Sequence, residues 1–215
     1  MTWFEKFQSE YRPILNQGAS GSKRGLIDGL YQRGQGFETM FHYLLSKAQH
    51  SYNIIETGTL RNPGQWKDGQ SARLFTEFVT EYGGRVRSVD IDPTACTTAK
   101  QALDPTYFNV TCSDSVIWLQ EQYDIEQVDL FYLDSWDVKW NDDILSARHH
   151  LLEFQAIQHK LKPGVMLAID DNSRFLHDNR RTGKGRMIVE YLDSLDIYPV
   201  YDQHQIIYIF SGAIC

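Results

Sequence analysis

Cysteine is scarce in this chain, with three among 215 residues: Cys96, Cys112 and Cys215. Their odd number and their spacing argue against a closed disulfide framework and against a cysteine-ligated metal. Long apolar runs are also missing, since no stretch approaches the roughly 18 residues of a membrane span. The first residues lack the apolar centre of a signal peptide. We therefore expect a cytoplasmic protein with no membrane partner.

Positive charge is in deficit, because the formal net charge is −7 at pH 7. Nonspecific nucleic-acid binding relies on lysine and arginine to neutralise phosphates, so nucleic acid is not the expected partner. Two local basic segments remain, Lys23-Arg24 and residues 180–186, and we interpret both as solvated loops. The content of 42% apolar and 23% charged residues is ordinary for one globular core of this length.

The chain divides into an N-terminal segment and a longer alternating one. Residues 1–50 carry apolar residues at helical spacing around a glycine-rich segment at 18–22, which predicts a helical cap. Residues 51–215 alternate between the strand and helix patterns and form the predicted main domain. Strands are expected at 52–57, 85–91, 107–112, 128–133, 164–170, 197–202 and 205–211, with helices at 70–82, 93–103, 115–123, 142–160 and 184–194.

This alternation predicts an α/β fold with a seven-stranded, mostly parallel sheet and helices on both faces, because consecutive βαβ units have right-handed crossovers. The last two strands are separated only by residues 202–205. A connection that short permits only an antiparallel hairpin, since a parallel return needs a dozen or more residues. We therefore expect an antiparallel hairpin at the C-terminal end of the sheet.

Acidic residues follow the predicted strands, where open α/β sheets bind ligands. Glu56 opens a glycine-containing loop at Gly58 that leads into a helix, although neither the Gly-x-Gly-x-x-Gly nor the P-loop spacing is present. Asp90 ends the second strand, where an acid can accept hydrogen bonds from ribose hydroxyls. Asp92 precedes a proline and is assigned to helix capping. Asp114 fits an N-cap and a cofactor contact equally well.

Three carboxylates follow the fourth and fifth strands: Asp134, Asp170 and Asp171. Adjacent strand ends can bring them within reach of one hard cation, and oxygen ligands suit Mg²⁺ or Mn²⁺. The other reading is that two of them cap helices while one binds a cofactor. Asn172 becomes a ligand if the register is shifted by one residue.

Five short motifs, in their order and spacing, resemble those of class I S-adenosylmethionine-dependent methyltransferases. They are Glu56-x-Gly58, Val89-Asp90-Ile-Asp-Pro, Ser113-Asp114, Leu133-Asp134-Ser-Trp136 and Leu161-Lys-Pro-Gly164 followed by Asp170-Asp171. Within the class the chain looks most similar to the metal-dependent O-methyltransferases, such as catechol O-methyltransferase and the sugar O-methyltransferases of macrolide biosynthesis. The resemblance covers residues 52–211 and implies a Rossmann-like methyltransferase fold with S-adenosylmethionine as cofactor.

The resemblance also implies roles for single residues in binding the cofactor. Glu56 and Gly58 are expected beside its methionine moiety, Asp90 on the ribose, and Ser113 with Asp114 near the adenine.

At the acceptor end the resemblance implies Asp134, Asp170 and Asp171 as ligands of Mg²⁺ or Mn²⁺, with Asp134 also beside the cofactor. Three residues after the first metal aspartate, the catechol branch carries a lysine base and the sugar branch a histidine. Here that position holds Asp137, with Lys139 further on, and these two are the preferred candidates for the base. Three histidines are further candidates: His149, His150 and His177.

The resulting hypothesis is an enzyme that moves a methyl group to a hydroxyl of a small molecule, sugar-like or catechol-like, aided by a divalent cation that lowers the pKa of that hydroxyl. Alternatives are a metal-independent methyltransferase acting on RNA or a small amine, and a non-catalytic cofactor-binding module. A nicotinamide-dependent oxidoreductase is the weakest alternative, because the glycine fingerprint is absent. A homo-oligomer is compatible with the sequence.

Overall fold

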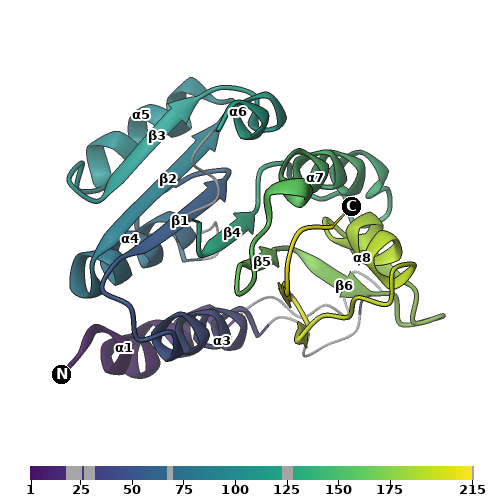
Figure 1. The fold of residues 1–215 in the computed structure, drawn as a ribbon, viewed down its shortest axis with the longest axis horizontal. Coiled ribbons are helices and arrows are strands. Elements are labelled where there is room, and N and C mark those ends of the chain that lie inside the picture. The colour runs from purple at the N-terminus through teal and green to yellow at the C-terminus, as the bar shows by residue number, and fades with distance from the viewer. Residues whose placement is uncertain (18–25, 27–31, 67–69, 123–127, 215) are drawn as a thin grey trace.

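The computed structural model describes residues 1–17, 26, 32–66, 70–122 and 128–214. A seven-stranded sheet in the order β3-β2-β1-β4-β5-β9-β8 runs through the molecule (Figure 1). Its strands are β1 (Tyr52–Thr57), β2 (Gly84–Asp90), β3 (Phe108–Cys112), β4 (Leu130–Leu133), β5 (Met166–Ile169), β8 (Tyr201–Asp202) and β9 (Ile206–Ile209). The larger helices are α3 (Arg33–Ser46), α4 (Ser71–Tyr82), α5 (Pro93–Ala102), α6 (Ser115–Glu121), α7 (Ile144–Ile157) and α8 (Arg186–Asp193).

The strand directions agree with the sequence prediction. β1, β2, β3, β4 and β5 pair in parallel, β9 is antiparallel to β5, and β8 is antiparallel to β9. The order reverses between β1 and β4, which lie side by side at the centre. In such sheets the ligand crevice lies outside the carboxyl ends of the strands at this point. The predicted seven-stranded sheet with its C-terminal antiparallel hairpin is confirmed.

Two apolar cores lie on the two faces of the sheet, because successive strand residues point to opposite sides. In β1, Ile54 belongs to the core under α3, α4 and α5, and Ile55 to the core under α6, α7 and α8. Figure 1 shows α1 and α3 along one side of the sheet and α7 with α8 on the other. Within the described residues, no helix is long and apolar enough to cross a membrane.

The N-terminal helices share a core with the sheet. They are α1 (Trp3–Lys6), a π-helical turn (Phe7–Tyr11), α2 (Arg12–Leu15) and α3. The Phe41 ring on α3 lies 4.8 Å from Trp3, 5.1 Å from Phe7 and 5.1 Å from Phe78 of α4, measured between ring centroids. The predicted glycine-rich segment at 18–22 lies outside the described residues.

One part of the chain differs from the sequence prediction. A second, two-stranded antiparallel sheet joins β6 (Asn172–Arg174) to β7 (Arg181–Gly183), and no pattern predicted it. The basic segment that contains β7 is not a solvated loop. Arg181 pairs with Asp202 at 2.7 Å, and Lys184 is only 1% exposed. The solvated-loop interpretation is therefore wrong for residues 181–186, because acidic partners distant in sequence compensate these charges.

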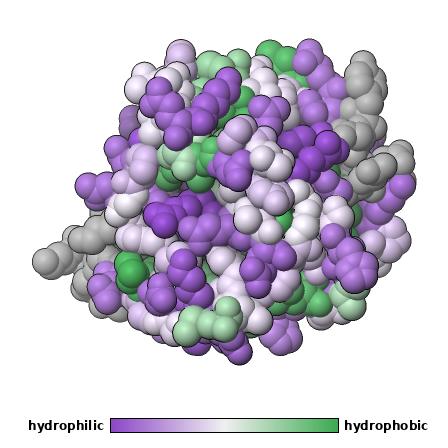
Figure 2. Space-filling model, turned by 90° about the vertical axis from the view of Figure 1, so that its left-hand side faces the viewer, coloured by the Kyte–Doolittle hydropathy of each residue, from purple (hydrophilic) through white to green (hydrophobic). Residues whose placement is uncertain are grey.

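The face of the molecule turned to the viewer in Figure 2 is mostly hydrophilic, with apolar residues in small, scattered groups. Single exposed apolar residues are normal on protein surfaces, and extended apolar patches are what mark docking sites. Among the described residues, this face therefore shows no extended apolar patch of the kind that marks a docking site.

Removing the Phe41 ring should destabilise the whole chain. Phe41→Ala leaves a cavity between the N-terminal helices and α4, and the expected loss is about 3–5 kcal/mol in the free energy of unfolding. Urea unfolding followed by tryptophan fluorescence and by circular dichroism should give one coincident transition at a lower midpoint. Ile14→Ala, at a site that is 39% exposed, is the control and should change little. Two separate transitions would contradict a shared core.

Candidate cofactor and acceptor site

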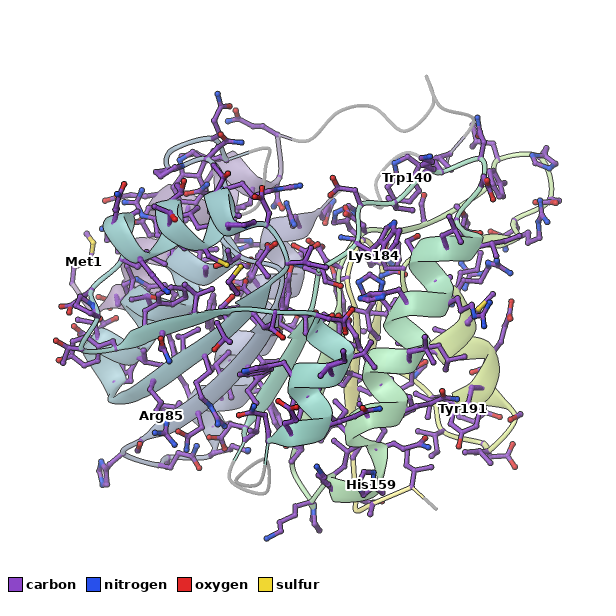
Figure 3. All side chains as sticks on the ribbon, turned by 90° about the horizontal axis from the view of Figure 1, so that it is seen from above. Met1, Arg85, Trp140, His159, Lys184 and Tyr191 are labelled. Atoms are coloured by element: carbon purple, nitrogen blue, oxygen red, sulfur yellow. The ribbon has the colours of Figure 1, made fainter. Side chains whose placement is uncertain are left out.

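The carboxyl ends of β2, β1, β4 and β5 bring the predicted site residues to one edge of the sheet. Figure 3 labels Arg85, near the start of β2, and Lys184, which lies toward the opposite end of the strands. The edge has two parts. A cofactor half contains Glu56, Gly58 and Asp90, and an acceptor half contains Asp134 and the residues that follow β5.

Gly58 lets the first loop turn closely over the end of β4. Its φ is 82°, a region that side chains rarely adopt, and a Cβ there would lie 2.6 Å from the carbonyl oxygen of Asp134. The Gly58 N–H donates to the carbonyl of Val89 at 2.8 Å, which ties this turn to the end of β2. The loop backbone is thereby held beside both Glu56 and Asp134.

Glu56 is a buried acid with unused hydrogen-bonding capacity. Its side chain is 1% exposed, and its Oε2 accepts a hydrogen bond from the Ser88 hydroxyl at 3.2 Å. Its Oε1 has no hydrogen-bond partner in the described part of the chain. Burial, above all, raises the pKa of Glu56 to about 8. An acid in this state fits a ligand that brings a cationic or hydrogen-donating group, such as the amino group of a methionine moiety.

Asp90 is held in place by two backbone N–H groups. Its Oδ2 accepts the N–H of Thr59 at 3.0 Å, and its Oδ1 accepts the N–H of Asp92 at 2.9 Å. These two bonds fix the carboxylate, and each oxygen retains a lone pair for a ribose hydroxyl. Burial raises the pKa of Asp90. Ser113 lies beside it, because its N–H donates to the Asp90 carbonyl at 3.0 Å.

Two further acids cap helices. The Asp92 carboxylate accepts the N–H of Thr94 at 2.8 Å at the start of α5, which confirms its predicted role. Asp114 Oδ1 accepts the N–H of Ile117 at 3.0 Å at the start of α6. The capping interpretation of Asp114 is therefore present in the structure, and its contact with a cofactor stays a prediction.

Asp134 lies between two cations. Its Oδ1 accepts a hydrogen bond from the Lys184 ammonium, and its Oδ2 lies 3.5 Å from the Arg33 guanidinium. Burial disfavours the charged form of Lys184, but Asp134 and Asp171 outweigh this effect and raise its pKa. The carboxylate keeps 16% of its side chain exposed, so it still faces solvent on one side.

Asp170 and Asp171 meet the same cations and one histidine. Asp170 Oδ2 pairs with Arg33, and Asp171 Oδ2 lies 2.9 Å from Lys184 Nζ. His204 Nε2 lies 3.5 Å from Asp170 Oδ1 and 3.4 Å from Asp171 Oδ1. Burial alone would raise the pKa of Asp171, but Lys184, His204 and Arg33 together lower it well below its usual range.

The predicted metal set fits this arrangement poorly. Within the described residues, the group whose atoms could surround one ion is Asp170, Asp171 and His204, and it does not include Asp134. Any ion there would lie beside the two cations already bound to these carboxylates. Asn172 is committed to the backbone, since its Nδ2 donates to the carbonyl of Ile169 at 2.8 Å and its Oδ1 accepts the N–H of Gly185 at 2.7 Å. Asp134, Asp170 and Asp171 therefore do not form one metal site in the described part of the chain.

The two preferred candidates for the base lie in the exposed segment between β4 and α7. Asp137 and Lys139 are exposed, and Asp137 forms an ion pair with Arg61 at 3.0 Å. Their catalytic role stays a prediction. Sequence reasoning missed Arg33, Lys184 and His204, which make the contacts with the aspartates. The spacing Gly-Lys-Gly at 183–185 is the one local signal that could have identified Lys184 as a fixed residue.

The predicted histidines at 149 and 150 belong to a buried network. It centres on Glu153 of α7, which is fully buried and accepts hydrogen bonds from hydroxyls on three elements. The donors are Thr57 at 3.1 Å, Ser135 at 2.7 Å and Ser115. His149 Nε2 lies 3.3 Å from the same carboxylate, while His177 is an exposed loop residue. The network ties the ends of β1 and β4 to α6 and α7 and so holds the floor of the site.

No family model matches the chain, and no curated protein matches its sequence. Solved structures match its fold. The MycE methyltransferase of the mycinamycin biosynthetic pathway, solved with Mg and S-adenosylhomocysteine, aligns over 94% of this chain with a TM-score of 0.56 and 15% identity. MycE solved with Mg, S-adenosylhomocysteine and mycinamycin VI aligns over 95% of this chain with a TM-score of 0.55 and 16% identity. The human methyltransferase 10 domain containing protein aligns over 81% of each chain with a TM-score of 0.50 and 9% identity.

These comparisons establish the fold. The chain has the Rossmann-like architecture of the S-adenosylmethionine-dependent methyltransferases, as its seven-stranded sheet and C-terminal antiparallel strand require. It spans 55–56% of the length of the MycE chains that it matches.

The raised pKa of Glu56 makes stability depend on pH. The folded protein keeps this acid protonated up to about pH 8, whereas the unfolded chain ionises it above about pH 4.3, so stability falls as pH rises between these values. Glu56→Gln removes the titration. As pH rises from 5 to 9, the melting temperature of the wild type should therefore fall relative to that of Glu56→Gln, by on the order of several degrees. Parallel melting curves across this range would contradict a buried, protonated Glu56.

Proposed function

We propose that this protein is an S-adenosylmethionine-dependent methyltransferase that acts on a hydroxyl of a small, polar molecule. The observation that carries this proposal is the cofactor half of the site. Three features lie together at the switch point of a methyltransferase fold: a buried acid, one of whose oxygens has no hydrogen-bond partner among the described residues, a glycine turn at positive φ, and a carboxylate fixed by backbone N–H groups.

These groups match the parts of the cofactor in order along the sheet. Glu56 at the end of β1 suits the methionine amino group, and Asp90 at the end of β2 suits the ribose hydroxyls. Ser113 and Asp114, after β3, would border the adenine. The Gly58 turn leaves backbone where a side chain would otherwise fill the space between the loop and Asp134.

The acceptor half favours a polar substrate. Its lining consists of carboxylates and cations, and a site built from hydrogen-bonding groups discriminates strongly against acceptors that leave them unpaired. A sugar-like hydroxyl fits this lining better than the flat edge of a catechol. MycE, a methyltransferase of the mycinamycin biosynthetic pathway with a similar fold, is consistent with a small-molecule acceptor.

In the proposed reaction the bound sulfonium supplies an electrophilic methyl group. S-adenosylmethionine held by Glu56, Gly58 and Asp90 would supply this methyl group to the acceptor oxygen and would leave as S-adenosylhomocysteine. Asp134, partly exposed beside the Gly58 turn, accepts the hydrogen bond of the acceptor hydroxyl and takes its proton. Lys184 and Arg33 hold the carboxylate in place. Orientation of the two reactants accounts for the remaining acceleration.

A divalent cation is not part of this proposal, because the aspartates predicted to bind it are paired with cations of the chain itself. This pairing favours transfer to a hydroxyl without a metal, and it does not favour the RNA or small-amine acceptors of the metal-independent alternative. RNA as acceptor is disfavoured by the net charge of −7. A non-catalytic module would bind the cofactor and transfer nothing, which the experiments below distinguish.

Asp90→Ala should weaken binding of S-adenosylhomocysteine by about 10- to 100-fold, since hydrogen bonds to a charged group contribute ~1.5–3 kcal/mol. Isothermal titration calorimetry measures this change. Asp92→Ala is the matched control, because it removes a neighbouring carboxylate that only caps α5. An equal loss of affinity in both variants would remove Asp90 from the ribose site, and no binding by the wild type would overturn the proposed function.

Asp134→Asn should lower the rate of methyl transfer by about 100-fold or more while binding of S-adenosylhomocysteine stays nearly unchanged, because a positioned base contributes 10²–10⁴-fold. Transfer of a radiolabelled methyl group to a panel of sugars and catechols measures the rate. Asp137→Asn is the comparison. A loss confined to Asp137→Asn would assign the base to that residue instead.

A further inference from the structure

The acceptor half contains a closed set of charge contacts, which we call the carboxylate ring: Asp134, Asp170, Asp171, Arg33, Lys184 and His204. Each of the six carboxylate oxygens faces one partner. Lys184 faces Asp134 Oδ1 and Asp171 Oδ2, and Arg33 faces Asp134 Oδ2 and Asp170 Oδ2. His204 faces the two remaining oxygens, Asp170 Oδ1 and Asp171 Oδ1. Side chains of this protein thus lie beside all six oxygens, and among the described residues Asp170 Oδ1 is the one of them that is buried without a hydrogen bond.

The backbone around Lys184 places its side chain in the carboxylate ring. Gly183 has a φ of 114°, and a Cβ at this position would lie 2.2 Å from the carbonyl oxygen of Asp171. The Lys184 N–H donates to that same carbonyl at 3.2 Å. Close approach of β7 to Asp171 therefore requires glycine next to the lysine.

Both flanks of Lys184 are anchored as well. The Gly183 N–H donates to the buried carboxylate of Asp143 at 2.9 Å, which also pairs with Arg186 at 2.9 Å. On the other side, Gly185 donates to Asn172 Oδ1 at 2.7 Å. A solvated surface lysine would need none of these contacts, and Lys184 is 1% exposed.

The charges of the carboxylate ring favour a lysine over a divalent cation at the position of the Lys184 ammonium group. The three aspartates carry −3 when ionised, and Arg33 with Lys184 supplies +2. A divalent cation would require the same oxygens and would be repelled by the two positive charges already bound to them.

Building on the proposed methyl transfer, we propose that Lys184 is a positioning residue whose ammonium group takes the place of a divalent cation, so that transfer proceeds without metal. Lys184 is too buried to reach an acceptor and acts through Asp134, whose partly exposed carboxylate it orients. Removing the lysine leaves a site with three carboxylates and one cation fewer. The variant should then acquire the metal site that the wild type lacks.

The test is a Mn²⁺ titration followed by electron paramagnetic resonance, in which the signal of free Mn²⁺ reports binding. Lys184→Ala should bind one Mn²⁺ per chain, and any binding of Mn²⁺ by the wild type should be at least about tenfold weaker than that. Lys184→Met, nearly isosteric and uncharged, is the second variant. Lys184→Arg keeps the charge and should stay without Mn²⁺. Lys100→Ala, which removes an exposed lysine of α5, is the control for net charge.

Methyl transfer provides the second readout. Wild-type transfer should be unchanged by a chelator, while Lys184→Ala should be slow in chelator and recover with Mn²⁺, a response that mere destabilisation does not produce. One Mn²⁺ per wild-type chain with the affinity of the variant, bound by Asp170, Asp171 and His204, would overturn the proposal. So would loss of wild-type transfer in chelator. Titration with S-adenosylhomocysteine tests the proposed function separately, because the Mn²⁺ result does not depend on it.

Discussion

The burial of several carboxylates at one edge of a parallel sheet is the constraint on which this structure depends. β4 and β5 pair in register, with Leu133 opposite Ile169, so Asp134 and Asp170 follow their strands side by side. Desolvated like charges repel strongly unless cations compensate them. Arg33 arrives from the N-terminal helix α3 and Lys184 from the segment after β7. The electrostatic requirement at the sheet edge thus explains why two segments outside the βαβ units pack against the acceptor half.

In the cofactor half the desolvation of buried acids is compensated in a different way. Glu56 is buried without a cation and is held neutral by a raised pKa, and Asp90 is fixed by backbone N–H groups alone. Both acids therefore retain acceptor capacity, whereas the aspartates of the carboxylate ring are paired with cations of the chain itself. The two halves of the edge thus compensate their carboxylates in different ways.

Sequence patterns predicted the strands and the capping role of Asp92 because these depend on local periodicity and on neighbours within a few residues. They predicted the C-terminal hairpin because the loop after β8 is too short for a crossover. They failed at residues 181–186, where an arginine- and lysine-rich segment resembles a solvated loop. Lys184 contacts Asp134, which lies 50 residues away in the sequence, and Arg33 contacts Asp170, which lies 137 residues away. Compensation of buried charge across such separations leaves no local pattern.

A tethered lysine and a bound metal ion impose different demands on a substrate. A divalent cation selects acceptors that offer two neighbouring oxygens, because both coordinate it and one loses its proton. An ammonium group that is already committed to Asp134 and Asp171 offers no such chelation. Recognition must then come from the shape of the pocket and from single hydrogen bonds, such as that to Asp134. If Lys184 replaces the metal, an isolated hydroxyl is sufficient for transfer, and the adjacent diol of a catechol or sugar gives no additional advantage.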